Sequence, residues 1–246
     1  MEEHQSVVEH LTVTRNLWQI TQQITRLAKS MYAGDLISQK NSEVYWQNAK
    51  STYLAPSEYY DRKEKALTNL LEESGRLTRG LDIGCGDGRY TRLLARICDQ
   101  VVAYEMSIDL ITQCEKINYQ ENVKNVKIKA GMLPSINEDN PFEIIACLGV
   151  TSCIISERYF KASIKKLASL GSPKHILITI DTLSTKPKDL INFNQDGYVA
   201  KYRNACRYQH AFEREGYILA DAVKLLEDQP KGWINRLSVF QVNGKQ

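Results

Sequence analysis

The sequence LDIGCGDG occupies residues 81–88 and lies between two patterned segments. The run GLDIG at residues 80–84 is typical of a strand, and the segment YTRLLARIC at residues 90–98 has the pattern of a helix. Three glycines at alternate positions let the backbone turn sharply and approach a ligand, because no Cβ stands in the way. The segment therefore predicts a ligand-binding loop between a strand and a helix.

The residues in and after this loop indicate which ligand it suits. Its glycine spacing is GxGxG, whereas a dinucleotide-binding loop has GxGxxG. Asp82 and Asp87 add carboxylates that would repel a pyrophosphate but suit a ligand carrying an amino group and a positive charge. Glu105 ends the next strand-like run, about 20 residues after the first loop glycine, where nucleotide-binding α/β folds place an acid for the ribose.

Together, the D-x-G-x-G-x-G loop and the acid at the end of the next strand resemble the class I S-adenosylmethionine-dependent methyltransferases, over residues 56–246. The resemblance implies S-adenosyl-L-methionine as cofactor and a seven-stranded sheet whose last strand is antiparallel. Glu105 would hold the ribose, and Met106 would lie against the adenine. The cofactor-binding residues that it implies are Asp82, Gly84, Cys85, Gly86, Gly88, Glu105, Met106, Met132 and Leu148.

Three of these assignments have alternatives. Asp82 would orient the loop or the cofactor's amino group, but a carboxylate there can also cap a helix or hold the loop together. Met106 can simply pack in the core. After the third strand, the sequence AGMLP at residues 130–134 lacks the acid that often receives the adenine amino group in this family, which leaves the backbone amide of Met132 as the candidate contact.

Working outward from the loop, short apolar runs alternate with helical patterns. Strands are predicted at 80–84, 100–105, 125–131, 142–149 and 175–181, with helices at 57–71, 90–98, 108–118 and 156–170. Two final runs, 216–226 and 235–243, have no helix between them and predict an antiparallel hairpin. The fold class is thus α/β, a doubly wound, mostly parallel seven-stranded sheet with an antiparallel terminal hairpin, preceded by an N-terminal amphipathic helix.

The N-terminal segment has a heptad pattern. Its apolar positions are Val13, Leu17, Ile20, Ile24, Leu27 and Met31. Such a stripe predicts a homodimer or a partner helix through residues 13–31, or equally an amphipathic helix that lies on its own domain. Breaking residues predict a loop around 33–42, which divides the chain into a helical extension at 1–40 and a methyltransferase domain at 41–246.

Composition limits the classes of protein. The chain is 43% hydrophobic and 25% charged, and no apolar run approaches the roughly 18–20 residues of a membrane span. The N-terminus lacks a signal-peptide pattern, which favours a cytoplasmic protein, and six scattered cysteines predict no metal site. Residues 161–246 carry 14 Lys/Arg against 8 Asp/Glu, too small an excess for a surface dedicated to polyanions, so a nucleic-acid partner is not favoured.

The methyl acceptor is less well defined by the sequence. The fourth strand leads into CLGVTS at residues 147–152 and lacks the Asn/Asp-Pro-Pro-Tyr signature of amino-methylating relatives. We therefore expect O-methylation of a small molecule or glycan. An RNA or protein methyltransferase and a non-catalytic scaffold subunit are the alternatives. The candidate general bases are Asp181, at the end of the fifth strand, and His210, although Asp181 can also cap a turn and His210 can simply face solvent.

Two groups of residues are candidates for contact with the acceptor. On a helix after the fifth strand, Tyr198 and Tyr202 would share a face, as would Arg203 and Arg207, and paired guanidinium groups suit an anionic or sugar-containing acceptor. The alternative for this segment is a solvated amphipathic helix. A second aromatic group lies ahead of the first strand, where the resemblance implies a lid over the cofactor, although some of its members must be core. It consists of Tyr45, Trp46, Tyr53, Tyr59 and Tyr60.

Overall fold

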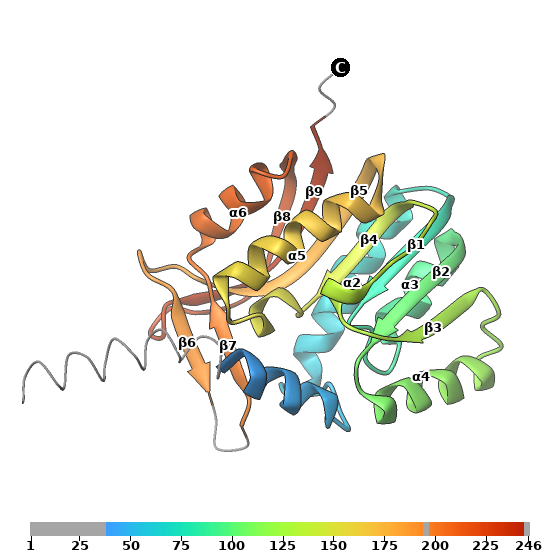
Figure 1. Cartoon of the computed structure of the whole chain (residues 1–246), viewed down its shortest axis with the longest axis horizontal. Helices are drawn as coiled ribbons and strands as arrows, with labels where there is room; N and C mark the ends of the chain where they lie inside the picture. The colour runs from blue at the N-terminus through green and yellow to red at the C-terminus, as the bar shows by residue number, and fades with distance from the viewer. Residues whose placement is uncertain (1–37, 194–196, 244–246) are drawn as a thin grey trace, which may run out of the picture.

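The computed structural model describes residues 38–193 and 197–243, and its central feature is a seven-stranded sheet (Figure 1). The strand order is β3-β2-β1-β4-β5-β9-β8. The strands are β1 (Leu77–Ile83), β2 (Cys98–Glu105), β3 (Val126–Ala130), β4 (Phe142–Leu148), β5 (Gly171–Ser184), β8 (Tyr217–Asp228) and β9 (Trp233–Val242). Strands β1 to β5 pair in parallel, and β9 pairs antiparallel with both β5 and β8. The predicted fold class, with its antiparallel terminal hairpin, is confirmed.

Helices follow the strands in the predicted alternation. They are α2 (Ser57–Glu73), α3 (Arg89–Ile97), α4 (Ile108–Gln120), α5 (Glu157–Leu170) and α6 (Ala205–Glu213), with short 3₁₀ turns η1 (Leu133–Ser135) and η2 (Thr151–Cys153). Three helices begin at residues whose side chains accept a hydrogen bond from a backbone amide of the first turn: Ser107, Ser156 and Asn204. These N-caps explain where α4, α5 and α6 start.

Helices cover both faces of the sheet. In Figure 1, α5 and α6 lie on the face toward the viewer, and α2 and α3 lie behind the sheet. Each face has its own apolar core, because successive strand residues point to opposite sides: Leu177 of β5 packs beneath α5 and α6, and Ile178 packs beneath α2 and α3. Burial on both faces accounts for the continuous apolar runs of the parallel strands.

One prediction about the segment after β5 was wrong. Residues 198–203 do not form a helix: β6 (Leu190–Phe193) and β7 (Val199–Tyr202) make a separate antiparallel pair, and α6 begins only at Ala205. Tyr198 and Tyr202 therefore do not share a helical face, and neither do Arg203 and Arg207. The spacing of four fits a helix, but pairing with β6 satisfies the backbone of this segment instead.

The N-terminal part of the described chain also differs from expectation. Residues 38–47 are helical, so the predicted loop around 33–42 was wrong for residues 38–42. The heptad segment 13–31 and residues 1–37 as a whole lie outside the described residues, and the domain boundary between 40 and 41 stays a prediction. In the part of the chain that the structure describes, no helix is long and apolar enough to cross a membrane.

Candidate functional site

The loop between β1 and α3 lies at the carboxyl edge of the parallel strands, where α/β sheets bind ligands. Gly84 has φ +69° and Gly86 has φ +58°, in the left-handed region that favours glycine. The amides of Gly84 and Cys85 both donate to the Tyr104 carbonyl oxygen, at 2.8 and 3.1 Å, which fixes the loop against β2. A Cβ at Gly84 would lie 2.5 Å from Cγ2 of Val150, so the close approach of the β4 loop also requires glycine.

Glu105, at the end of β2, joins this loop to the next one. Its buried carboxylate accepts hydrogen bonds from the amide of Gly86 at 2.9 Å and from the amides of Met106 and Ser107 at 2.8 and 3.0 Å. A carboxylate offers about four acceptor positions, and these bonds use three of them. One position on Oε2 is left for a hydroxyl of a ligand, so the carboxylate could accept a hydrogen bond from one ribose hydroxyl.

Asp82 lies beneath the loop rather than on its surface. Its carboxylate is 2% exposed and accepts a hydrogen bond from the hydroxyl of Thr91 in α3 at 2.6 Å. Burial raises the pKa of Asp82 to about 7. This geometry favours the role of holding β1 and α3 together around the loop over direct contact with a ligand.

Beside the loop, two methionines line a small cavity. Met106 and Met132 form one wall with Val150, and residues of the helix 38–47, among them Trp46, form another. The cavity has a volume of about 80 Å³, well below the roughly 300–1,000 Å³ of a ligand pocket. The amide of Met132 donates to the Ser135 hydroxyl at 3.3 Å, so a ligand would have to share this donor. The structure thus places Met106 and Met132 in the lining of one cavity, and their contact with a cofactor stays a prediction.

Residues 38–56, which we call the strap, cross the carboxyl edge of the sheet and cover the cavity (Figure 1). At one end, the side-chain oxygen of Gln39 accepts from the amides of Ile155 and Ser156 at 2.8 and 3.2 Å. At the other end, the hydroxyl of Tyr53 donates to Asp87 in the glycine loop at 2.9 Å. A ligand of nucleoside size could enter only if the strap moved.

The comparisons with known proteins agree with this architecture. Residues 81–174 match the family described as "Methyltransferase domain". No curated protein sequence matches the chain. Residues 81–174 therefore form a methyltransferase domain, and its fold is shared by solved S-adenosylmethionine-dependent methyltransferases.

Three solved methyltransferases illustrate the structural similarity, which at these identities concerns the fold alone. N-methyltransferase NodS from Bradyrhizobium japonicum WM9, with S-adenosyl-L-homocysteine, is 16% identical over 83% of this chain and 98% of its own, with a TM-score of 0.64. The 1,6-didemethyltoxoflavin-N1-methyltransferase of Burkholderia thailandensis is 12% identical over 86% and 89%, with a TM-score of 0.64. An O-methyltransferase from a Brevibacillus brevis multienzyme is 11% identical over 73% and 71%, with a TM-score of 0.59.

In the methyltransferase, the loop after β4 is held from beneath by Asp181. This residue lies within β5, three positions before its end, and is 2% exposed. Its carboxylate accepts from the Ser152 amide at 2.9 Å and from the Tyr208 hydroxyl at 2.8 Å. Burial raises the pKa of Asp181. Because Asp181 is buried beneath the loop and its carboxylate holds the Ser152 amide, the geometry favours positioning of the β4 loop over proton abstraction.

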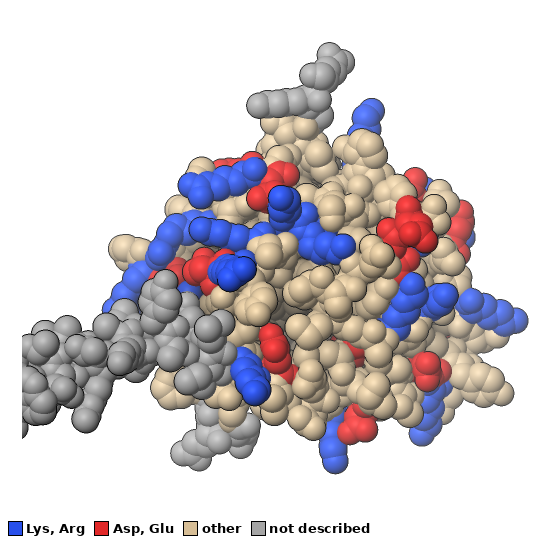
Figure 2. Space-filling view, viewed as in Figure 1, with Lys and Arg blue, Asp and Glu red and all other residues tan. Residues whose placement is uncertain are grey.

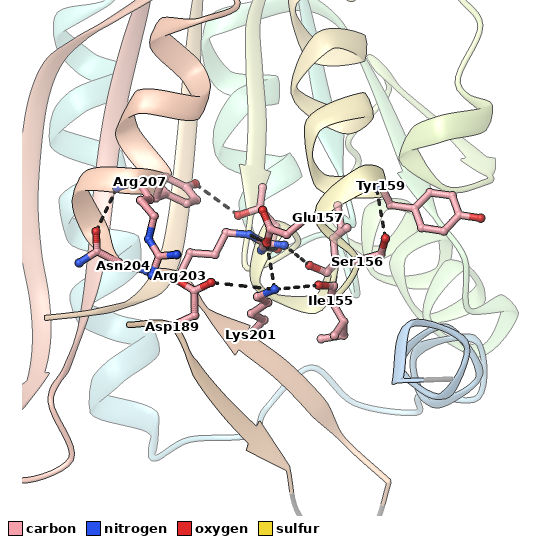
Figure 3. Close-up of polar contacts among 12 residues, drawn as sticks. Ile155, Ser156, Glu157, Tyr159, Asp189, Lys201, Arg203, Asn204 and Arg207 are labelled. Carbon is pink, nitrogen blue, oxygen red and sulfur yellow. Dashed lines mark hydrogen bonds and ion pairs between the residues drawn. The ribbon is translucent and has the colours of Figure 1, made fainter. Parts of the chain in front are cut away.

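Arg203 holds the same loop from the side of the β6–β7 hairpin. Its guanidinium donates to the carbonyl oxygens of Thr151 and Ile154 at 3.0 and 2.6 Å and to Glu157 at 2.9 Å. It also lies 3.7 Å from the Phe160 ring centroid. Figure 3 shows its side chain extending toward Glu157. Arg203 is 3% exposed, so it is a buried support for the loop after β4.

Arg207 and His210 lie in a different environment, on the outer side of α6. The Arg207 guanidinium, 59% exposed, pairs with Asp189 at 3.0 Å, and the His210 ring pairs with Glu213 at 3.2 Å. They line a groove of about 430 Å³ between α5 and α6 that has both basic and acidic residues in its lining. Figure 2 shows Lys and Arg side chains with some Asp and Glu among them on this face of the molecule. Among the described residues, no hydrogen bond or ion pair joins His210 to Asp181, so the two predicted bases are not brought together.

The predicted aromatic groups do meet. The rings of Tyr45, Trp46 and Tyr198 lie edge to face, with centroids 5.3 to 6.1 Å apart, and Tyr202 lies 6.2 Å from Trp233 of β9. The strap and the β6–β7 hairpin thus approach each other at the carboxyl edge of the sheet (Figure 1). The Tyr198 side chain interacts electrostatically with Cys153, so this aromatic enclosure adjoins the loop after β4.

Sequence reasoning missed two features of the site. The contacts of Gln39 and Ser42 with the loop that precedes α5 span more than 110 residues and leave no local signal. The second is Lys63, which occupies the buried face of α2 in the series Tyr60, Lys63, Leu67 and Leu71. Here a signal was present, because a lysine at an apolar helical position is unusual.

Proposed function

We propose that this methyltransferase transfers the methyl group of S-adenosyl-L-methionine to an oxygen atom of a small-molecule or glycan acceptor. The observation that carries the proposal is the buried carboxylate of Glu105. It binds the amides of both cofactor-side loops and keeps one acceptor position for a ribose hydroxyl. A pyrophosphate would be repelled there, whereas a nucleoside with a neutral ribose suits the charge.

The remaining cofactor residues fit the same group. Gly84 and Gly86 let the backbone approach the methionine moiety, and Met106 and Met132 offer polarisable side chains to the adenine. When bound, the cofactor supplies a methyl carbon that its sulfonium already activates. The protein must then orient an acceptor oxygen in line with that carbon and exclude water.

The loop after β4 is well suited to orient the acceptor. Asp181 fixes it through the amide of Ser152, and Arg203 fixes it through two carbonyl oxygens. The aromatic enclosure of Tyr45, Trp46 and Tyr198 would exclude water and admit a small acceptor more readily than a polymer. These supports favour positioning catalysis, in which the loop geometry matters more than any single proton transfer.

The environment of Asp181 affects which kind of acceptor oxygen is favoured. Because Asp181 is buried and its carboxylate holds the Ser152 amide and the Tyr208 hydroxyl, it is a weak candidate for taking a proton from a sugar hydroxyl. A phenol or carboxylic acid needs little help to ionise. Within the proposed O-methylation, we therefore place acidic oxygens ahead of sugar hydroxyls in an acceptor screen.

Titration calorimetry of the full chain with S-adenosyl-L-methionine and S-adenosyl-L-homocysteine tests the proposal. We expect saturable binding, weakened at least about tenfold by Glu105→Gln, because an amide group would face the donor of Gly86. Glu115→Gln, at an exposed position of α4, is the matched control and should bind like the wild type. A wild-type chain that is folded by circular dichroism but binds neither compound would contradict the proposal.

A further inference from the structure

Lys63 is a buried cation in a cage of aromatic rings. It lies on the buried face of α2 and is 6% exposed. Its ammonium nitrogen lies 5.0 Å from the ring centroid of Tyr90, 5.3 Å from that of Tyr59 and 5.9 Å from that of Tyr60. Three electron-rich rings stabilise the charged form of the lysine, but they do not neutralise it.

The expected counter-ion is missing. Among residues 38–193 and 197–243, no carboxylate lies within 4.0 Å of the Lys63 ammonium, and no hydrogen bond to it is seen. Burial lowers the pKa of Lys63 to about 8, and the buried carboxylate of Asp181 acts in the opposite direction from beyond contact distance. The ammonium group therefore still carries a proton for much of the time near neutral pH. Buried charges in proteins are normally paired. A lysine that is buried without a partner in the protein suggests that a ligand supplies one.

Two other buried polar atoms in this neighbourhood also lack partners. The hydroxyl of Tyr90, on the ring nearest to Lys63, and Oδ1 of Asn235 have no hydrogen bond within the described part of the chain. Asn235 lies near the hydroxyl of Tyr59, whose ring also faces Lys63. Buried polar groups are rarely left unpaired, so their gathering here indicates a place that a polar ligand completes.

The position of this group connects it with the proposed site. Tyr90 is the second residue of α3, directly after the glycine loop, and Asn235 pairs with Thr182 at the carboxyl end of β5. The cage therefore lies between the cofactor loop and the sheet edge where the acceptor is expected.

We propose that Lys63 and the Tyr90 hydroxyl form a subsite for the carboxylate of a ligand bound at this edge. A singly charged oxyanion matches one ammonium group. A phosphate dianion fits less well, because the nearby Arg89 is already paired with Asp61 and Glu64 at 2.9 and 2.6 Å. The Tyr90 hydroxyl donates a hydrogen bond to the second carboxylate oxygen.

The inference rests on the proposed function, and two ligands of that function bring a carboxylate. One is the cofactor, through its methionine moiety, and the other is an acceptor that carries a carboxylic acid. The two sources share the same chemistry at Lys63, and an experiment can separate them because 5′-methylthioadenosine has the nucleoside and the thioether but lacks the carboxylate.

The test follows the titration of Lys63 itself. The full chain is labelled with [ε-¹³C]lysine, and the Lys63 signal is identified by its absence from Lys63→Met. We expect a carboxylate that binds beside the ammonium to raise its titration midpoint by at least about one pH unit. If S-adenosyl-L-homocysteine raises the midpoint and 5′-methylthioadenosine does not, the carboxylate belongs to the cofactor. If only benzoate added to the S-adenosyl-L-homocysteine complex raises it, the carboxylate belongs to the acceptor.

Calorimetry separates failure of this inference from failure of the proposed function. The wild type should bind the ligand that bears the carboxylate more tightly than the ligand that lacks it. This ratio of affinities should fall by about tenfold or more in Lys63→Met and stay unchanged in Lys65→Met, which is at an exposed position of the same helix. If S-adenosyl-L-homocysteine binds but the Lys63 midpoint stays unchanged with it and with added benzoate, the subsite is refuted and the cofactor assignment stands. If S-adenosyl-L-homocysteine does not bind at all, the proposed function fails first and the subsite with it.

Discussion

Alanine substitution of two glycines with the same φ can separate backbone strain from steric crowding in the cofactor loop. Gly84 and Gly75 both have φ +69°, but a Cβ at Gly75 would meet nothing within 4 Å, whereas one at Gly84 would lie 2.5 Å from Cγ2 of Val150. Gly75→Ala should therefore cost only the left-handed backbone strain, about 1–2 kcal/mol of unfolding free energy. Gly84→Ala should add an overpacking cost of about 1–3 kcal/mol.

Urea unfolding followed by circular dichroism measures both losses, and a double-mutant cycle tests their cause. Val150→Ala removes the methyl group that the new Cβ would meet, so Gly84→Ala should cost only about 1–2 kcal/mol in that background. Because Val150 lines the cavity with Met106 and Met132, Gly84→Ala should also weaken binding of S-adenosyl-L-homocysteine, and Gly75→Ala should not. Equal stability losses for the two alanine variants, or an unchanged cost beside Val150→Ala, would refute this reasoning.

Three further predictions concern the supports of the site. Because the pKa of Asp82 is raised to about 7, its contribution to stability is present below about pH 4 and is lost as the pH rises to about 7. The unfolding free energy of Asp82→Asn, measured by urea unfolding, should therefore rise relative to that of the wild type by up to about 4 kcal/mol between these pH values. A difference that does not depend on pH would contradict this. Arg203→Met should lower the unfolding free energy by about 2–4 kcal/mol, because two buried carbonyl groups lose their donors, and the exposed Arg207→Met should change it by less than about 0.5 kcal/mol; equal losses would argue against a buried support. Gln39→Ala should speed amide hydrogen exchange at residues 153–156, as measured by mass spectrometry, and unchanged exchange would mean that the strap does not protect them.

The sheet and the cofactor loop could be predicted from sequence because their signals are local. The glycine loop needs left-handed backbone angles at Gly84 and Gly86, and the parallel strands are buried on both faces, which requires runs of apolar residues. Both requirements concern residues that are close together in the sequence. The boundaries differ by a few residues; the largest difference is at β5, which extends from Gly171 to Ser184 because its ends pair with β4 and β9.

The segment after β5 shows where a local pattern misleads. Tyr198, Tyr202 and Arg203 have a spacing that suits a helix, yet residues 199–202 are a strand in which the buried positions are adjacent. Ala200 packs in the core, and Lys201 reaches Glu157 at 3.0 Å. Glu157 lies 44 positions before Lys201, so the spacing within the segment could not distinguish strand from helix.

The site itself is built from contacts of this long-range kind, and this has a consequence for ligand entry. Gln39 and Ser42 bind the loop before α5, and Ala49 accepts from Ser107 at 2.7 Å, so the strap is tied to loops that follow different strands. Each such bond contributes about 1 kcal/mol, so releasing the strap costs a few kcal/mol. An open form of that energy is populated at about 0.1–10%. Since a cavity of about 80 Å³ cannot hold a nucleoside, we expect the affinity for the cofactor to be reduced by this opening cost. The same polar residues that shape the site thus also limit access to it.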